Sequence, residues 1–213
     1  MEKYISKKEK ASYGFAAVGS YMVAGITQSY LMYFFTDILI IPSAFVMMLM
    51  IVARAWDALN DPMMGVIVDR TSTKYGKMRP YVLIGSFLML VTTIVLFMPL
   101  TGAPTMFKMI FAAVSYIIFG MAYTLTDVPA MGLMSVATPN SDERASLLSF
   151  YVTVGSVGSL LPVGLLTIFQ SFIPEKYVYF AMSIFVGIIT SAAYLTPVSY
   201  THLRAHETVL DLV

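Results

Sequence analysis

Long apolar segments separated by short polar connections recur along the whole chain, and this pattern gives the first prediction. Crossing a bilayer as a helix takes about 20 mostly apolar residues, and the apolar segments reach that length. They cover residues 12–38, 43–69, 79–101, 107–135, 145–171 and 176–197. The connections hold proline, glycine, hydroxyl residues and charges, which are typical of turns. The pattern predicts an all-α membrane protein with six transmembrane helices.

The composition supports a membrane protein and excludes several other classes. Of the 213 residues, 58% are hydrophobic and only 12% are charged, against about 25% charged in soluble domains. The net charge of +1 leaves no basic patch of the kind that nucleic acid requires. The absence of cysteine excludes disulfides and thiolate metal sites. Without a Ser–His pair, a metal cluster or a nucleotide-binding loop before residue 198, we expect no enzyme.

Cations are concentrated in every second connection, which predicts the orientation in the membrane. The N-terminal segment and the second and fourth connections hold Lys3, Lys7, Lys8, Lys10, Arg70, Lys74, Lys77, Arg79 and Arg144. The other connections hold only Lys108 and Lys176. Since positive loops remain in the cytoplasm, we expect the N-terminus to be cytoplasmic and the protein to lie in the cell membrane. The first apolar segment is read as a retained span and not as a cleaved signal peptide.

The chain changes character after Pro197. Residues 198–213, VSYTHLRAHETVLDLV, hold both histidines and are more polar than any earlier segment. Their sequence resembles the in-frame translation of a cloning adaptor, which predicts a non-native tail; a short native cytoplasmic helix is the alternative. The predicted domain is therefore a six-helix bundle over residues 1–197, and we expect the native protein to continue beyond it.

The second apolar segment carries charges in its middle, in the stretch ARAWDALNDPMMG at 53–65. A charge at the centre of a spanning helix costs about 2.5–3.5 kcal/mol, so such residues normally face a bundle interior or a cavity. Asp57, Asn60 and Asp61 have the spacing of one helix face. Their oxygens suit a hard monovalent cation or a shared proton. In the alternative, Arg54 neutralises Asp57 as a structural counter-charge and Asp61 only bonds a neighbouring helix.

The fourth apolar segment holds a second acid, in YTLTDVP at 123–129. Asp127 has Thr124 three residues before it, on the same helix face. A carboxylate can accept hydrogen bonds from adjacent sugar hydroxyls, which predicts a substrate contact for Asp127 and an ion-site oxygen for Thr124. The alternative is a protonated acid that is hydrogen-bonded within the bundle.

The connection after the second segment has a specific form, GVIVDRTSTKYGKMRP at 65–80. A basic loop by itself indicates only topology. This form matches the loop between the second and third helices of major facilitator transporters, where an acid and an arginine form a charge lock between helices. The match implies a cytoplasmic gate made of Asp69, Arg70, Lys77 and Arg79.

Taken together, these strings resemble the N-terminal half of the glycoside–pentoside–hexuronide:cation symporter family. The other matching strings are SYGF at 12–15, YLMYFFTD at 30–37 and DERASL at 142–147, so that the resemblance covers nearly all of residues 11–197. It implies one six-helix half of a major facilitator transporter, with the C-terminal half missing. It also implies a site for Na⁺, Li⁺ or H⁺ made of Asp57, Asn60, Asp61 and Thr124, and a sugar-binding acid at Asp127.

Three positions depart from the family pattern at the substrate site. Tyr21 stands where the family has a first-helix acid, Met131 replaces a fourth-helix tryptophan, and Tyr151 replaces a fifth-helix arginine. We expect these residues to line the substrate cavity with Asp127. Because an acid, an aromatic platform and a cation are lost, a different glycoside or a lysolipid-like amphiphile is an open alternative.

The sequence therefore predicts a cation-coupled symporter of a sugar or glycoside. Its expected partners are a small-molecule substrate, a monovalent coupling cation, the lipid bilayer and the missing C-terminal half; neither nucleic acid nor a cofactor is expected. The hypothesis from another class is a transport-inactive fragment that acts only as a structural module.

Overall fold

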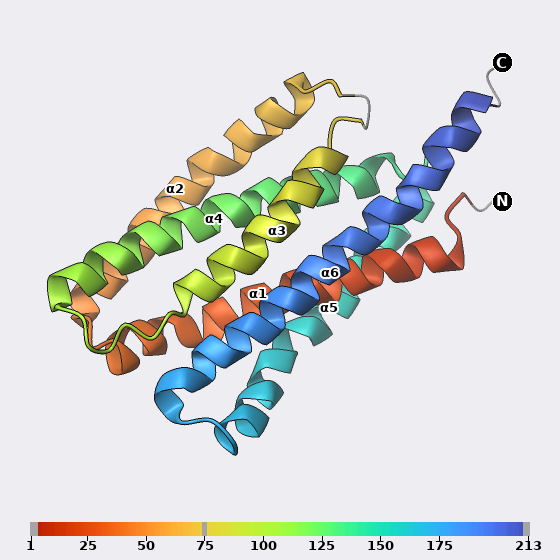
Figure 1. Ribbon diagram of the computed structural model, residues 1–213. Coiled ribbons are helices and arrows are strands. Elements are labelled where there is room, and N and C mark those ends of the chain that lie inside the picture. The colour runs from red at the N-terminus through yellow and green to blue at the C-terminus, as the bar shows by residue number, and fades with distance from the viewer. Residues whose placement is uncertain (1–3, 74–75, 211–213) are drawn as a thin grey trace.

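The computed structural model describes residues 4–73 and 76–210, and side chains within that range up to Val198. The chain forms six long helices (Figure 1). They are α1 (Lys7–Tyr33), α2 (Ser43–Arg70), α3 (Arg79–Leu96), α4 (Thr105–Val136), α5 (Ser141–Gln170) and α6 (Glu175–Leu210), and a π-helical turn, η1 (Phe34–Ile38), extends α1. The all-α class is confirmed.

Within the described residues, five helices, α2 to α6, are long and apolar enough to cross a membrane. The helix α1 is less apolar because Gly, Ser and Tyr residues and Gln28 are interspersed among its apolar residues. The prediction of six transmembrane helices is thus matched by five, and a crossing by α1 remains a prediction.

Most helix ends differ from the predicted segments, and three of these differences have a clear physical reason or bear on a prediction. The helix α1 begins at Lys7 because Ser6 caps it, its Oγ accepting from the Glu9 N–H at 3.1 Å. The helix α3 ends at Leu96 and not at residue 101, since the following Phe-Met-Pro sequence disfavours helical backbone. The helix α6 continues through Pro197 to Leu210. The predicted tail at 198–213 is therefore helical as far as it is described; residues 211–213 lie outside the described part, and the non-native origin of the tail remains a prediction.

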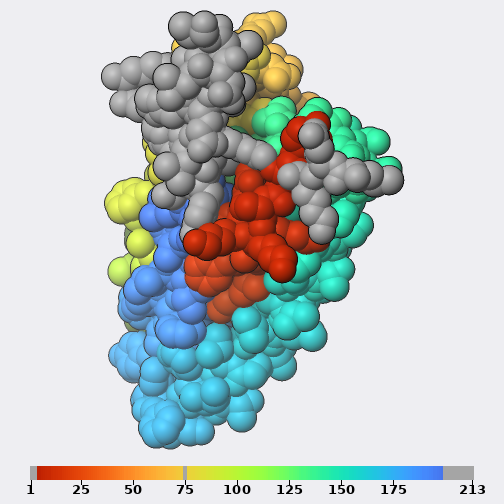
Figure 2. All heavy atoms as spheres, turned by 90° about the vertical axis from the view of Figure 1, so that its right-hand side faces the viewer, coloured from red at the N-terminus to blue at the C-terminus, as the bar shows by residue number. Residues whose placement is uncertain are grey.

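The helices pack in a symmetric set of pairs. The helix α1 lies between α5 and α6, as Figure 2 shows, while α4 packs against α2 and α3 (Figure 1), and α3 packs against α6. Exchanging α1 with α4, α2 with α5 and α3 with α6 reproduces these five pairs, although α5 also packs against α6 and α2 has no comparable contact with α3 in the described residues. Two inverted three-helix repeats of this kind are common in transporters. The backbones of α1 and α4 approach each other less closely than those of the pairs named above, and the space between them holds the site described below.

Small residues and hydroxyls allow α1 and α6 to approach closely. A Cβ atom on Gly19 would lie 2.7 Å from the Ala193 Cβ, so only glycine fits at that position. The Thr190 hydroxyl donates to the Gly19 carbonyl at 2.8 Å. This contact fixes α1, which supplies one wall of the site, against α6.

The turn between α1 and α2 has a strained backbone, and a lysine of α4 holds it in place. Ile40 has a φ of 58°, which is unusual for a β-branched residue. Next to it, the buried Lys108 ammonium donates to the Leu39 carbonyl at 2.8 Å. This hydrogen bond satisfies a carbonyl that the helix end leaves without a partner, and it links the turn to the start of α4.

Candidate functional site

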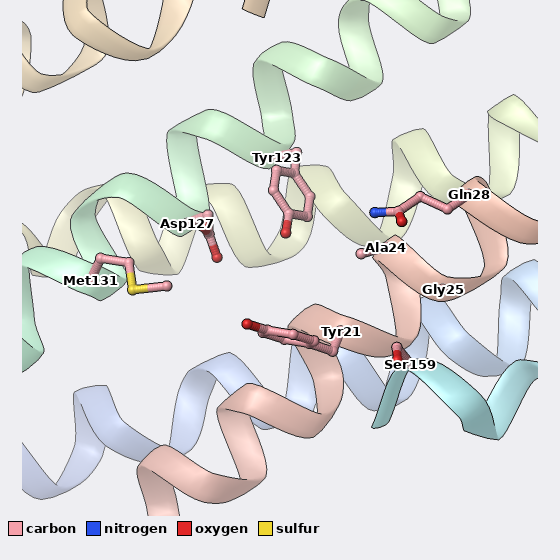
Figure 3. Close-up of a pocket in the computed structure, with 8 residues that line it drawn as sticks. All are labelled: Tyr21, Ala24, Gly25, Gln28, Tyr123, Asp127, Met131 and Ser159. Carbon is pink, nitrogen blue, oxygen red and sulfur yellow. The ribbon is translucent and has the colours of Figure 1, made fainter. Parts of the chain in front are cut away.

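Two cavities lie side by side between α1, α2, α4 and α5. The first, the Asp127 cavity, has a volume of about 350 Å³. It is lined by Tyr21, Ala24, Gly25 and Gln28 of α1, Tyr123, Asp127 and Met131 of α4, and Ser159 of α5 (Figure 3). The second, the Asp57–Asp61 cavity, has a volume of about 430 Å³ and lies between α1, α2 and α4.

The Asp57–Asp61 cavity brings together three of the four predicted ion-site residues. Asp57 and Asp61 of α2 and Thr124 of α4 all line it. The buried Thr124 hydroxyl donates to the Asp61 Oδ1 at 2.8 Å, while the Asp61 residue itself is exposed. The hydrogen bond joins α2 to α4, and the oxygens of both groups retain lone pairs that can accept a further ligand.

Arg54 lies beside Asp57 in the same cavity, but the pair is loose. Its guanidinium is 3.9 Å from the Asp57 Oδ2, and the two side chains are 69% and 32% exposed. An exposed ion pair of this kind contributes at most about 1 kcal/mol. Among the described residues Asp61 has no ion-pair partner, so the cavity holds two carboxylates and one cation. The surplus negative charge suits a monovalent cation.

The fourth predicted ligand, Asn60, lies outside the lining of this cavity. Successive residues of a helix are separated by about 100°, which places Asn60 and Asp61 on opposite flanks of Asp57. The buried Asn60 Nδ2 has no hydrogen-bond partner within the described part of the chain. The structure thus brings the two carboxylates together and leaves the amide apart.

Asp127 is held by two donors from other helices. Its Oδ1 accepts from the Ser20 hydroxyl of α1 at 3.1 Å and from the Tyr194 hydroxyl of α6 at 3.2 Å. The Ser20 hydroxyl is also 3.5 Å from the Tyr123 hydroxyl. Within the described residues, Oδ2 accepts no hydrogen bond, so one oxygen orients the carboxylate and the other remains available to a ligand.

The other predicted substrate contacts divide into two groups. Tyr21 and Met131 line the Asp127 cavity on opposite walls (Figure 3). The structure places Tyr151 outside that lining: it is 1% exposed and packs behind Tyr21, with ring centroids 6.2 Å apart and planes at 73°. Tyr151 therefore acts on the cavity through Tyr21.

Several cavity residues were not found from the sequence. Tyr123 lies four residues before Asp127 and Gln28 lies seven after Tyr21, so helix spacing could have identified both. Tyr194 and Ser159 carry no such signal, because they reach the site from other helices. Their positions depend on the packing of α6 and α5 against α1.

The two cavities share a wall. Ala24, Gln28 and Tyr123 line both of them. Thr124 faces the Asp57–Asp61 cavity, and Asp127, one helical turn along α4, faces the other. A ligand in one cavity is therefore separated from a ligand in the other by single side chains.

The predicted gate lies at the far end of α2 and the start of α3. The Lys77 ammonium donates to the Asp69 backbone carbonyl at 3.2 Å, and Arg79 is the first residue of α3. In the described part of this loop no ion pair joins the Asp69 carboxylate to Arg70. The expected charge lock remains a prediction.

Comparison with known proteins identifies the family. A family model described as "MFS/sugar transport protein" matches residues 12–210. An uncharacterized symporter YjmB of Bacillus subtilis (strain 168) is 37% identical over 161 residues, covering 75% of this chain and 35% of its own length. The inner membrane symporter YicJ of Escherichia coli (strain K12) is 35% identical over 161 residues, covering 74% of this chain and 34% of its own length. A putative glycoside/cation symporter YagG of Escherichia coli (strain K12) is 31% identical over 188 residues, with coverages of 86% and 40%.

The chain spans about a third of the length of these relatives. The resemblance to the glycoside–pentoside–hexuronide:cation symporters is confirmed, and with it the view that the protein is not an enzyme. The chain is a multi-pass membrane protein that belongs to the MFS/sugar transport protein family.

Proposed function

We propose that this protein is a cation-coupled symporter that moves a sugar or glycoside across the cell membrane, with its N-terminus in the cytoplasm. The observation that carries the proposal is the shared wall between the Asp57–Asp61 cavity and the Asp127 cavity. Because the chain spans about a third of its relatives, transport is proposed for the whole protein and the six helices are proposed to supply one wall of its pathway.

The coupling ion is Na⁺, Li⁺ or H⁺, bound by Asp57 and Asp61 with the Thr124 hydroxyl. The charge of the cavity supports this, since a single positive charge balances the surplus carboxylate. Asn60 is proposed as a further ligand that reaches the ion by a change of side-chain rotamer, because its buried amide nitrogen has no partner among the described residues.

The substrate binds in the Asp127 cavity, where the free oxygen of Asp127 accepts from a hydroxyl and Gln28 supplies an amide. The volume of about 350 Å³ lies at the small end of the range for ligand pockets, which favours a sugar ring over an acyl chain. The description of a relative as a putative glycoside/cation symporter agrees with this choice.

Coupling follows from the position of α4 between the two ligands. A bound cation is coordinated by Asp61 of α2 and the Thr124 hydroxyl of α4 together, which bridges the two helices and fixes the α4 turn that carries Asp127. Linkage then requires that the substrate raise the affinity for the cation by the same factor. Asp69, Arg70, Lys77 and Arg79 are proposed to close the cytoplasmic end in one state.

The test is uptake of radiolabelled methyl glycosides by vesicles that contain the whole protein, with Na⁺, Li⁺ or a proton gradient supplied separately. Asp61→Asn should abolish cation-stimulated uptake, while Asp37→Asn, an exposed acid outside both cavities, should leave it intact. Cation-stimulated uptake that survives Asp61→Asn would overturn the proposed ion site. Inhibition by lysophospholipid and not by sugars would instead assign an amphiphile as substrate.

A further inference from the structure

The side chain of Tyr21 packs unusually closely against the backbone of α5. A Cβ atom built on Gly155 would lie 2.6 Å from the Tyr21 Cδ2, 2.8 Å from Cε2 and 2.9 Å from Cγ. These three atoms are consecutive in the ring, and the distances are nearly equal. An approach from the ring edge would leave the two flanking atoms much farther away than the central one. The Gly155 backbone therefore lies over one face of the Tyr21 ring.

A second residue of α5 supports the same ring. Tyr151 lies one helical turn before Gly155, on the same side of α5. Its ring meets that of Tyr21 in a T-shaped contact, with centroids 6.2 Å apart and planes at 73°. The Tyr151 hydroxyl is buried, lies near the Ser20 hydroxyl and makes no hydrogen bond of ordinary geometry in the described part of the chain, so Tyr151 contributes mainly its ring.

The remaining face of the Tyr21 ring is turned to the cavity. Tyr21 lines the Asp127 cavity from α1, while α5 supports it from behind. Figure 3 shows the ring nearly edge-on, with Tyr123 and Asp127 on the side opposite the backbone of α1. An aromatic face therefore lies across the cavity from a carboxylate that has one free oxygen.

We propose that Tyr21 is the aromatic platform on which the substrate sugar ring stacks, and that Gly155 and Tyr151 are the residues that position it. This rests on the proposed sugar transport. The C–H face of a pyranose is apolar and slightly positive, which suits the negative face of an aromatic ring. A sugar stacked on Tyr21 presents its ring-edge hydroxyls to Asp127 and Gln28. The first helix thus supplies the stacking surface that Met131 cannot provide from the fourth.

The proposal predicts a pattern of affinities that simple loss of packing would not produce. Tyr21→Leu should weaken binding of methyl β-galactoside, β-glucoside or β-xyloside by about tenfold, while Tyr21→Phe should change it less than twofold. Epimers differ in whether a polar hydroxyl interrupts the stacked face. The affinity ratio of galactoside to glucoside should therefore approach one in Tyr21→Leu and be retained in Tyr21→Phe.

The positioning residues supply a second, independent test. Gly155→Ala should push the ring into the cavity and weaken glycoside binding. Gly164→Ala, on the same helix, should not, because a Cβ atom added there would have no atom within 4 Å. In a Tyr21→Leu background, Gly155→Ala should have no further effect, because the ring it displaces is gone. Tyr151→Phe should retain the wild-type epimer ratio and Tyr151→Leu should lose it.

The measurement is isothermal titration of these glycosides into the whole protein in nanodiscs at saturating Na⁺. Cation-dependent fluorescence of Trp56, which lines the other cavity and is the single tryptophan of these 213 residues, checks that each variant is folded, with any tryptophan elsewhere in the whole protein replaced by phenylalanine. Unchanged affinity and epimer ratio in Tyr21→Leu would overturn the platform and leave the transport proposal standing. If the wild-type protein binds none of the three glycosides, both proposals are overturned.

Discussion

The Thr124 hydroxyl donates to the Asp61 carboxylate at 2.8 Å, one helical turn before Asp127 on the same helix. This bond is the point at which α4, which carries the candidate substrate contact, meets the candidate ion site on α2. We therefore expect that removing the Thr124 hydroxyl lowers the affinity for the cation without unfolding the protein.

Thr124→Ala should weaken Na⁺ binding by about tenfold, since a hydrogen bond to a charged group is worth about 1.5 kcal/mol or more. The readout is a Na⁺ or Li⁺ titration of Trp56 fluorescence, because Trp56 lines the same cavity. The matched control is Thr153→Ala, an exposed hydroxyl of α5 that bonds only its own helix. Equal cation affinities in the two variants would show that Thr124 is not part of the ion site.

Tyr194→Phe should lower the free energy of unfolding by about 1 kcal/mol, because it deletes one of the two donors to Asp127 and leaves the ring in place. Glycoside affinity should fall several-fold in the same variant, since the carboxylate is then held by Ser20 alone. Thermal unfolding and calorimetric titration measure the two effects. Tyr177→Phe, an exposed tyrosine of α6, should show neither.

Gly120→Ala should weaken cation binding while leaving glycoside stacking intact. A Cβ atom at this position of α4 would lie 3.2 Å from the Asp57 Oδ1, so the carboxylate must move. We expect a roughly fivefold loss of Na⁺ affinity, since crowding of this kind costs about 1 kcal/mol. The Trp56 titration measures it, with Gly164→Ala as the control; equal affinities would show that Asp57 is not confined by α4.

Ile40→Gly should stabilise the protein by about 1 kcal/mol, because glycine adopts a positive φ without the steric cost that a side chain carries. Ile40 is 72% exposed, so little packing is lost. Ile40→Ala retains the strain and should not raise the melting temperature measured in detergent. If Ile40→Ala raised the melting temperature as much as Ile40→Gly, backbone strain at Ile40 would not explain the gain.

The sequence predicted the helices well because long apolar segments between polar connections are a strong signal of helices in a membrane protein, although α1 is less apolar than the other five. Helix spacing and family resemblance grouped Asp57, Asn60, Asp61 and Thr124 into one ion site. The first, third and fourth of these line one cavity, whereas Asn60, on the other flank of Asp57, lies outside its lining. The donors to Asp127 were not predictable, because Ser20 and Tyr194 meet it only after α1, α4 and α6 pack. The same holds for Gly155, whose role depends on a side chain of another helix.

The wall shared by the two cavities has a consequence for how specificity can diversify. A substitution at Ala24, Gln28 or Tyr123 alters the surroundings of both ligands at once. Met131 and Ser159 are among the residues that line only the Asp127 cavity, so they can change without altering the Asp57–Asp61 cavity. Under the proposed function, new sugar preferences should therefore arise by variation at such positions, while the three shared ones are restricted to residues that also suit the cation.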